Sequence, residues 1–451
     1  MEKIIKRSVP IWSAIEHYRR RQGNWEKLKT VAVISGPAGC GKTTLLLDYF
    51  KNKRYFYFSF AGLDENIAER LLSEKISAAA GIAVKHWDGA FGALIRKYKY
   101  IIFDDLAYIT NCARFRNSFY ECMFQDFHSR PLVFLITQMI SSLTGLADSF
   151  SVINMGYFSI PETMKLLPEL SKHDILGLCA VSGGIPKIIQ EYDVQRSFME
   201  NLLDFLSPSS AFIDFMPHLM EKHFRRPEIY NRILCAIANG SHRISDIGRF
   251  TGFACNKCDN YLSALLSTEI VKAEKEKTKN GVEKTVYTLY NSYFKLWYLY
   301  VYQNRTELTV GNEALRGSIV NAVSEKEVHA LFIQKAFSYV NSKMSDFWTS
   351  FRISDKIIYA PQIVQSANFS YSFDAIHRNG DKAVFVKVFS DPLENCKRKE
   401  IEKLRKAVIL TNKYYNSHVF IFTKRRFSDY AAQQAPIDET ISFVEIERLK
   451  Q

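Results

Sequence analysis

The segment GPAGCGKTT, residues 36–44, constrains the fold of this chain more than any other. It follows the apolar run Val31–Ile34 and precedes Leu45–Leu47, so it is expected to join a buried strand to a helix with an apolar face. Its three glycines let the backbone curl so that N–H groups point inward at phosphate oxygens, next to a positive helix N-terminus. A merely structural turn needs neither Lys42 nor Thr43 at these offsets. The segment therefore predicts a loop that binds a nucleoside triphosphate.

Within this loop the side chains have distinct expected roles toward ATP and Mg²⁺, the two predicted cofactors. Lys42 would supply a positive charge for the β- and γ-phosphates, and the Thr43 hydroxyl would ligate Mg²⁺. The predicted nucleotide contacts are Gly36, Pro37, Ala38, Gly39, Cys40, Gly41, Lys42, Thr43 and Thr44.

Two further apolar runs end in polar residues. Tyr98–Phe103 is followed by Asp104 and Asp105, and ligands of parallel sheets bind at the carboxyl ends of the strands. We expect Asp104 to hold Mg²⁺ through water and Asp105 to orient or deprotonate the attacking water. The alternative is a strand that ends in a polar turn. Thr137, at the end of the next run, would sense the γ-phosphate or position water, or would only make strand-end hydrogen bonds.

Strands and helices alternate along residues 1–155, which predicts an α/β domain with a mainly parallel sheet covered on both faces. The expected elements include a helix at Val9–Gln22, a strand at Arg54–Phe60 and a helix at Asp64–Ala80. Residues 156–224 are expected to be helical, with Gly183-Gly184 ending one helix and Pro186 starting the next. This region is predicted to be a helical lid over the nucleotide, or a helical linker.

Residues 225–305 have the pattern of a winged helix. Three predicted helices, Ile229–Ala238, Ile244–Phe250 and Ala254–Leu266, precede a hairpin with Asn280-Gly281 at its turn. The third helix would present Asn256, Lys257 and Asn260 to base edges in the DNA major groove. Because the lysines of the hairpin are nearly matched by glutamates, the alternative is a domain for protein contact or spacing. The aromatic residues of 287–302 would stack on single-stranded bases or form a core between domains.

Residues 306–451 predict a small α/β domain with a helix at Glu325–Ser342, strands at Ser372–Arg378 and Lys382–Phe389, a helix at Leu393–Tyr415 and two more strands. Its basic residues make it the better candidate for nucleic-acid binding by charge, and the alternative is a solvated helix face. They are Lys397, Arg398, Lys399, Lys403, Arg405, Lys406, Lys424, Arg425 and Arg426.

Composition adds expectations about partners and compartment. The formal charge of +13 favours a polyanionic partner such as DNA. Charges interrupt the N-terminal segment and no apolar run reaches about 18 residues, so we expect a cytoplasmic protein with no membrane segment. Cysteines in that compartment would remain thiols, and Cys255 and Cys258 would be half of a zinc site or part of a helix core.

Taken together, GPAGCGKTT, IIFDD, LVFLIT, SGGIP and NSYFKLWYLYV make the chain resemble the archaeal-type ATPase family of the AAA+/STAND branch. The resemblance implies a P-loop ATPase core, a lid, a winged helix and a C-terminal degenerate PD-(D/E)xK nuclease-like domain. It also implies a nucleotide-dependent switch or motor acting with DNA, with a protein partner or further copies of the chain as other possible partners. For an arginine finger, Arg114, Arg116 and Arg130 are equal candidates.

Two departures from the family pattern bear on activity. The second acid of the strand tip is usually Glu, and Asp105 is shorter by on the order of 1.5 Å. A misplacement of about 1 Å can cost about a hundredfold in rate, so slow hydrolysis is expected, or a nucleotide-gated binding module without turnover. In the nuclease-like domain Asp374, Lys387 and Glu327 match family positions, but Phe385 replaces an acid. An inactive remnant is therefore expected rather than an ATP-regulated nuclease.

Overall fold

A computed structural model describes residues 31–109, 112–124, 131–138, 151–277, 283–347, 357–366, 368–379, 382–389, 398–411, 416–423 and 441–445, with Phe427 and Gln433. The helix predicted at Val9–Gln22, Arg130, the turn Asn280-Gly281, and the basic residues Lys397 and Lys424–Arg426 lie outside this range. Among the described helices, none has the length and apolar character that a membrane crossing requires.

The described chain forms two compact units. The first contains the described residues through Leu166, together with Ser182–Asp193 and Asp204–Asn312. The second contains Leu167–Val181, Val194–Leu203 and the described residues from Glu313 onward. The helices of the predicted lid are thus divided between the two units, and the four-domain division at residues 155, 224 and 305 stays a prediction.

A five-stranded sheet lies at the centre of the N-terminal α/β region. Its strands are β1 (Val31–Ser35), β2 (Phe56–Ser59), β3 (Tyr100–Asp104), β4 (Leu132–Thr137) and β5 (Ser151–Asn154). They pair in the order β2-β3-β4-β1-β5, and every pair is parallel, as the alternation of strands and helices predicts. This order brings the carboxyl ends of β3 and β4 next to the end of β1, from which the phosphate loop starts.

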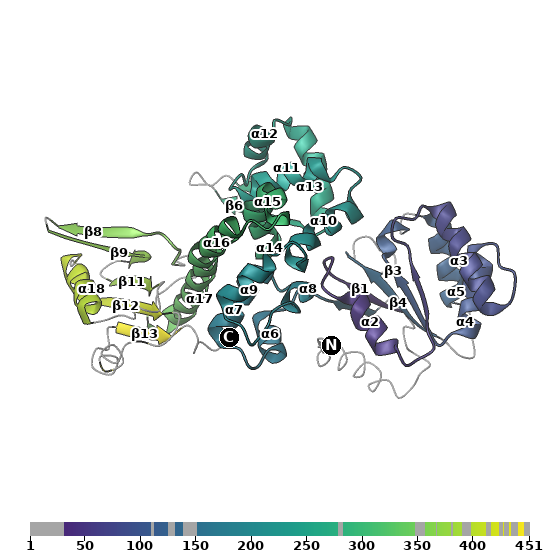
Figure 1. The fold of residues 1–451 in the computed structure, drawn as a ribbon, viewed down its shortest axis with the longest axis horizontal. Helices are drawn as coiled ribbons and strands as arrows, with labels where there is room; N and C mark the ends of the chain where they lie inside the picture. The colour runs from purple at the N-terminus through teal and green to yellow at the C-terminus, as the bar shows by residue number, and fades with distance from the viewer. Residues whose placement is uncertain are drawn as a thin grey trace. The chain divides into compact units, whose positions relative to one another are not determined.

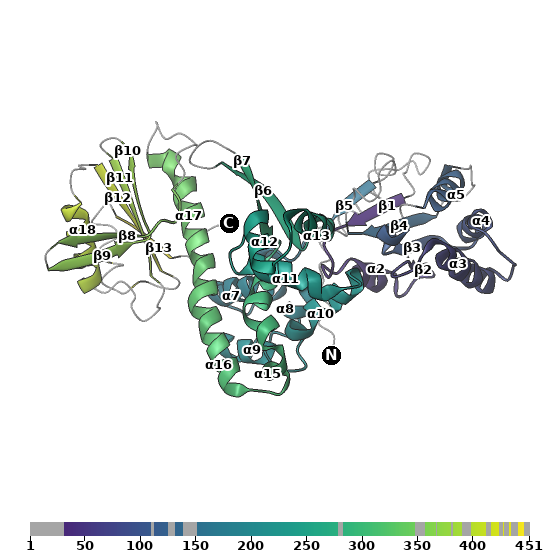
Figure 2. The same cartoon turned by 90° about the horizontal axis from the view of Figure 1, so that it is seen from above.

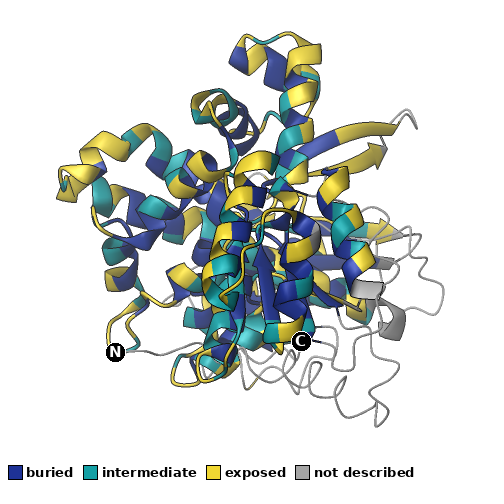
Figure 3. Cartoon of the chain, turned by 90° about the vertical axis from the view of Figure 1, so that its right-hand side faces the viewer, coloured by how far each residue is buried: buried dark blue, intermediate teal, exposed yellow. Residues whose placement is uncertain are grey.

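Helices cover both faces of this sheet (Figure 1). One face packs against α3 (Glu65–Ala80), α4 (Trp87–Lys97) and α5 (Ala113–Phe124), and the other packs against α2 (Lys42–Phe50). Successive side chains of a strand point to opposite faces, so Val31 and Val33 join the α3–α5 side while Ala32 and Ile34 join the α2 side. Burial follows this arrangement, with buried strands and helices whose outer faces are exposed (Figure 3).

Helices α4 and α5 and strand β5 have no counterpart among the predicted elements, and local sequence explains the omission of α4 and β5. Helix α4 contains Gly89 and Gly92, which lower helix propensity, and its N-cap His86 makes no side-chain capping bond. Helix α3, which the pattern predicts, begins at the side-chain cap of Asp64 on Ile67 N and ends at Gly81 in the left-handed region. Strand β5 has four residues, only two of them apolar, which is too short for a periodic signal.

Five helices follow the sheet: α6 (Ile160–Leu166), α7 (Lys172–Ser182), α8 (Pro186–Ile189), α9 (Phe198–Phe205) and α10 (Ala211–His223). Gly183 and Gly184, with φ of 59° and 77°, end α7, and Pro186 opens α8, as the sequence predicts. A Cβ at Gly184 would lie 2.2 Å from the carbonyl oxygen of Phe158. Glycine therefore permits both the turn and the close approach of the two backbones.

The next region has the predicted order of three helices and a hairpin. Its elements are α11 (Pro227–Ala238), α12 (Ile244–Thr251), α13 (Cys255–Ser267) and the antiparallel strands β6 (Val271–Lys277) and β7 (Glu283–Leu289). Asn256, Lys257 and Asn260 are all exposed on α13. Cys258 is buried on this helix while Cys255 is exposed. We call this region, residues 227–289, the three-helix unit.

The aromatic segment that follows forms the helical run α14 (Ser292–Leu296), η5 (Trp297–Val301), η6 (Tyr302–Asn304) and α15 (Arg305–Thr309). Tyr293 and Trp297 are buried, and they donate hydrogen bonds to the carbonyl oxygens of Phe212 at 2.8 Å and Ile213 at 3.1 Å. These aromatic side chains fasten the segment to α10. They form a core, and buried rings are not accessible for stacking on bases.

The C-terminal part of the second unit begins with three helical elements, α16 (Glu313–Ala322), η7 (Val323–Val328) and α17 (His329–Phe347). Six strands follow: β8 (Gln362–Ser366), β9 (Phe369–Phe373), β10 (Ala375–Asn379), β11 (Lys382–Phe389), β12 (Asn416–Thr423) and β13 (Ile441–Glu445). Helix α18 (Arg398–Leu410) lies between β11 and β12 in the chain. The sheet has the order β10-β11-β12-β13, with β10 antiparallel and the other pairs parallel. Helix α18 covers one face, and Tyr339 of α17 packs on Phe420 and Phe422 of the other (Figure 2).

Candidate nucleotide site

The phosphate loop between β1 and α2 has a backbone that only glycine can follow. Gly36, Gly39 and Gly41 have φ of 152°, 75° and 92°. A Cβ at Gly36 would lie 1.8 Å from the Met155 carbonyl oxygen, and one at Gly39 would lie 2.4 Å from the Phe215 ring. The backbone N–H of Gly36 donates to the Gln138 carbonyl oxygen at 3.2 Å. The loop therefore packs closely against the ends of β4 and β5, which fixes its backbone as a phosphate-binding loop requires.

Lys42 lies at the base of this loop and is buried. Its Nζ donates to the carbonyl oxygens of Gly36 at 2.6 Å and Pro37 at 2.8 Å. Burial lowers the pKa of Lys42, and the charges of Cys40 and Asp104 oppose that effect. Because a phosphate oxygen is a stronger, charged acceptor than a carbonyl, the ammonium group is suited to exchange these partners for a phosphate.

Asp104, at the end of β3, faces Thr43 across the start of α2. The Thr43 hydroxyl donates to Asp104 Oδ2 at 2.6 Å, the Tyr57 hydroxyl donates to the same oxygen at 3.1 Å, and the Asp105 N–H donates to Oδ1 at 2.7 Å. Burial raises the pKa of Asp104, and the bond from Thr43 opposes the rise. A carboxylate beside a hydroxyl supplies the oxygen ligands that Mg²⁺ takes, so these two residues fit the predicted ion.

Asp105 has a left-handed backbone, with φ of 52°, directly after the strand. Its Oδ2 accepts from the Ser59 hydroxyl at 3.0 Å, and its Oδ1 pairs with Lys222 Nζ at 2.8 Å. Non-glycine residues held in this backbone region often lie at functional sites, because the surrounding structure must compensate the strain.

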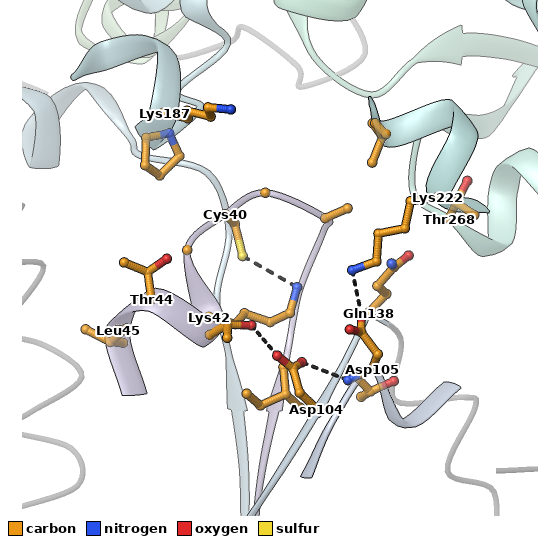
Figure 4. Close-up of a pocket in the computed structure, with 18 of the residues that line it drawn as sticks. Cys40, Lys42, Thr44, Leu45, Asp104, Asp105, Gln138, Lys187, Lys222 and Thr268 are labelled. Carbon is orange, nitrogen blue, oxygen red and sulfur yellow. Dashed lines mark hydrogen bonds and ion pairs between the residues drawn. The ribbon is translucent and has the colours of Figure 1, made fainter. Parts of the chain in front are cut away.

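A cavity of about 1110 Å³ connects these residues, all within the first unit (Figure 4). The loop residues Ala38 to Thr44 line it. Gly36 and Pro37, also predicted nucleotide contacts, do not line it, and their carbonyl oxygens accept hydrogen bonds from Lys42. The strand ends contribute Asp104, Asp105, Thr137 and Gln138. Thr137 is only 1% exposed. The structure thus brings together the predicted residues Lys42, Thr43, Asp104, Asp105 and Thr137.

Side chains from helices outside the sheet complete the wall of the cavity, and the sequence, which predicts a helical lid or linker here, singles out none of these side chains. Helix α8 and its C-cap contribute Pro186, Lys187 and Gln190. Helix α10 contributes Phe215, His218, Leu219, Lys222 and His223, and the end of α13 contributes Ser267 and Thr268. In Figure 4, Lys222 extends to Asp105 from its own helix, and Lys187 lies on the opposite side of the cavity. The sequence of α10 reads as an ordinary amphipathic helix, so no local signal distinguishes these side chains from a packing face.

His223, on this wall of the cavity, makes the folding stability depend on pH. Its Nε2 lies 2.9 Å from Gln138 Nε2, and burial, followed by the charge of Lys222, lowers the pKa of His223 from 6.5 to about 4. Because the folded pKa is depressed, the unfolded chain binds the proton first as the pH falls. The contribution of His223 to stability is therefore complete above pH 6.5 and is lost toward pH 4.

We expect this loss to amount to roughly 2 kcal/mol of unfolding free energy. Urea denaturation of the wild type and of His223→Gln at pH 7 and pH 4.5 would measure it. The unfolding free energy should change less between the two pH values in the variant, because glutamine does not titrate. An equal difference in both proteins would contradict the assignment of a buried neutral histidine.

The predicted nuclease residues lie in the second unit, on β11 and the elements before it. Asp374 Oδ2 accepts from the Val388 N–H at 2.7 Å, and burial raises the pKa of Asp374. Lys387 Nζ donates to the Ser372 hydroxyl at 3.3 Å, and Glu327 is half-buried in η7. Phe385 is 1% exposed in the apolar core. Among the residues with described positions, no group of three or more His, Cys, Asp or Glu side chains is arranged to hold a metal ion.

Residues 28–162 match the model of a protein family described as an AAA domain. The chain is also similar to the uncharacterized protein MJECL04 of Methanocaldococcus jannaschii, with 22% identity over 296 residues. That match covers 62% of this chain and 66% of the relative, so the chain spans slightly less than two thirds of the relative's length.

The chain also has a low similarity to two solved structures. The Walker-type ATPase PABY2304 of Pyrococcus abyssi is 15% identical with a TM-score of 0.42, and covers 63% of this chain and 95% of its own. The Aeropyrum pernix ORC1 protein in complex with DNA is 12% identical with a TM-score of 0.34, and covers 63% of this chain and 87% of its own. The family match and the parallel sheet support a P-loop core of AAA type, and thereby nucleotide binding.

Proposed function

We propose that this protein binds Mg-ATP in the cavity at the phosphate loop and hydrolyses it slowly, as a nucleotide switch coupled to DNA or protein contact. The observation that carries the proposal is the convergence of Lys42, the Thr43–Asp104 pair and Asp105 on one cavity. A turn that did not bind Mg-ATP would need neither a buried lysine nor two carboxylates at the neighbouring strand tip.

Each residue has a role that follows from its position. The loop N–H groups and Lys42 would bind and orient the phosphates, since charge-assisted donors at a helix N-terminus favour anions. Thr43 and Asp104 would hold Mg²⁺, whose charge would offset that of the β- and γ-phosphates. Asp105, at the strand tip, would orient the attacking water and accept its proton.

The switch part of the proposal rests on the walls of the cavity. A bound nucleotide would touch α8, α10 and the end of α13 as well as the sheet. These helices lead into the three-helix unit, which exposes Asn256, Lys257 and Asn260 on α13. We therefore propose that this unit is a winged helix, with these three side chains as its contacts to DNA bases.

A second candidate function is a nucleotide-gated binding module without turnover. Asp105 favours it, because both carboxylate oxygens already have protein partners. An ATP-regulated nuclease is a weaker candidate, because Asp374 accepts a backbone hydrogen bond and Phe385 occupies the core. We expect no Mg²⁺-dependent DNA cleavage by the wild type, and cleavage abolished by Asp374→Ala would contradict that expectation.

Lys42→Ala tests the proposal most directly. We expect ATP affinity to fall roughly a hundredfold, because about 3 kcal/mol of charge-assisted bonding is lost. Binding is measured by calorimetry and turnover by phosphate release, each with and without duplex DNA. Lys85→Ala is the matched control, because Lys85 is exposed and outside the cavity.

Equal ATP binding by the wild type and Lys42→Ala would overturn the site. Lys42-dependent binding without any phosphate release would favour the module over the ATPase. Stimulation by DNA that is lost when Asn256, Lys257 and Asn260 are replaced by alanine would support the DNA contacts on α13.

A further inference from the structure

Both carboxylate oxygens of Asp105 are held by partners. Ser59 Oγ donates to Oδ2 at 3.0 Å, and Lys222 Nζ lies 2.8 Å from Oδ1. A carboxylate that accepts a proton from water needs an oxygen directed at that water. Ser59 belongs to the sheet, but Lys222 comes from α10, 117 positions along the chain.

Helix α10 contacts three parts of the catalytic centre. Phe215, Leu219 and Lys222 are spaced at i, i+4 and i+7, so they lie on one helical face, and all three line the cavity. The Phe215 ring lies against Gly39 of the phosphate loop, and a Cβ there would meet it at 2.4 Å. Next to Lys222, the ring of His223 contacts Gln138 at the end of β4.

The backbone around Lys222 is held at the same place. The Tyr108 hydroxyl, just beyond the tip of β3, donates to the Lys222 carbonyl oxygen at 2.7 Å. The start of α10 is fastened by Tyr293 and Trp297 through the carbonyl oxygens of Phe212 and Ile213. The ion pair is thus one part of a set of contacts that positions α10 against the strand tips.

Aromatic side chains connect the end of α10 to α13. Phe224 directly follows the helix and stacks on Tyr230 of α11 at a centroid distance of 3.9 Å. Tyr230 packs edge-on against Tyr261 of α13 at 5.1 Å. A displacement of α13 would therefore be transmitted by packed rings to the segment that carries Lys222.

We propose that the Lys222–Asp105 ion pair is an autoinhibitory contact, in which α10 keeps the Asp105 carboxylate from the attacking water until α10 is displaced. Lys222 is then a positioning residue that acts through Asp105. This inference rests on the proposed ATPase function and adds its regulation: a partner that moves α13 would withdraw Lys222 and permit turnover. The Lys222 side chain is 44% exposed, so water can solvate its ammonium group when the pair separates.

The test compares Mg-ATP turnover of the full chain in the wild type and Lys222→Met, which keeps the unbranched shape of the side chain and removes its ammonium group. We expect turnover to rise about tenfold. In the wild type the Lys222–Asp105 contact must break before the transition state is reached, and its absence in the variant lowers the activation free energy by about the strength of one charge-assisted hydrogen bond. Lys222→Arg should stay near the wild type, and Lys222→Met combined with Asp105→Asn should lose the gain. Glu221→Gln, an exposed neighbour on α10, is the control.

A second readout does not depend on turnover. Amide hydrogen exchange of residues 216–223 without nucleotide should be at least about threefold faster in Lys222→Met, because a tie between α10 and the sheet is lost. Unchanged exchange would overturn the inference, as would turnover of Lys222→Met that equals or falls below the wild type. Failure of the proposed function has a different signature, since the wild type would then lack Lys42-dependent ATP binding and phosphate release.

Discussion

Replacing Asp105 by asparagine should lower phosphate release at least about a hundredfold while ATP still binds. Loss of a general base costs about 10² to 10⁴ in rate, and an amide cannot accept the proton from the attacking water. Asparagine keeps the shape of the side chain and can still accept a bond from Ser59, so the strand tip should remain folded. Single-turnover phosphate release and calorimetric ATP binding separate the two effects.

The matched variant is Asp105→Glu, which restores the side-chain length that is usual in the family. If the short carboxylate limits hydrolysis, the glutamate variant should turn over faster than the wild type, since about 1 Å of misplacement can cost about a hundredfold. A wild-type rate in Asp105→Asn would instead mean that another group activates the water. Loss of ATP binding in that variant would mean that Asp105 belongs to the binding site and not to the chemistry.

The part of the site that sequence predicts is the part encoded locally. Lys42 and Thr43 have fixed offsets within a nine-residue loop, and Asp104 and Asp105 directly follow an apolar strand. These four residues lie close together because parallel strands have their carboxyl ends at the same edge of the sheet. The register of β1 with β4, which sets Ser35 beside Thr137, brings the end of the next strand to the same edge.

The other wall of the cavity depends on long-range packing. The pair Lys222–Asp105 joins residues 117 positions apart, and nothing near either residue in the sequence specifies the other. Helix α10 has the same periodicity whether its face meets a core or a nucleotide. The position of α10 is set instead by Tyr293 and Trp297, which donate hydrogen bonds to two of its carbonyl oxygens. The aromatic sequence around these residues predicts that they are buried, but it does not predict which carbonyl oxygens they bind.

Gly36→Ala should cause the largest loss of stability of any single methyl addition in the phosphate loop. The new Cβ would lie 1.8 Å from the Met155 carbonyl oxygen, and the residue would keep a φ of 152° that L-residues rarely adopt. Relief requires the loop to leave the end of β5, although the Met155 N–H is bonded to the Ser35 carbonyl oxygen at 2.7 Å. We expect a cost of roughly 3 kcal/mol or more, together with loss of ATP binding.

Gly62→Ala provides the control that separates crowding from backbone strain. Gly62 also has a left-handed backbone, with φ of 70°, but a Cβ there would meet no atom within 4 Å. Its replacement should cost about 1 kcal/mol and leave ATP binding intact, because only the backbone preference is lost. Chemical denaturation and ATP titration of both variants measure the difference. Equal costs at the two positions would mean that the loop can move away from Met155, and the phosphate cradle would then be adaptable rather than held in place by the ends of β4 and β5.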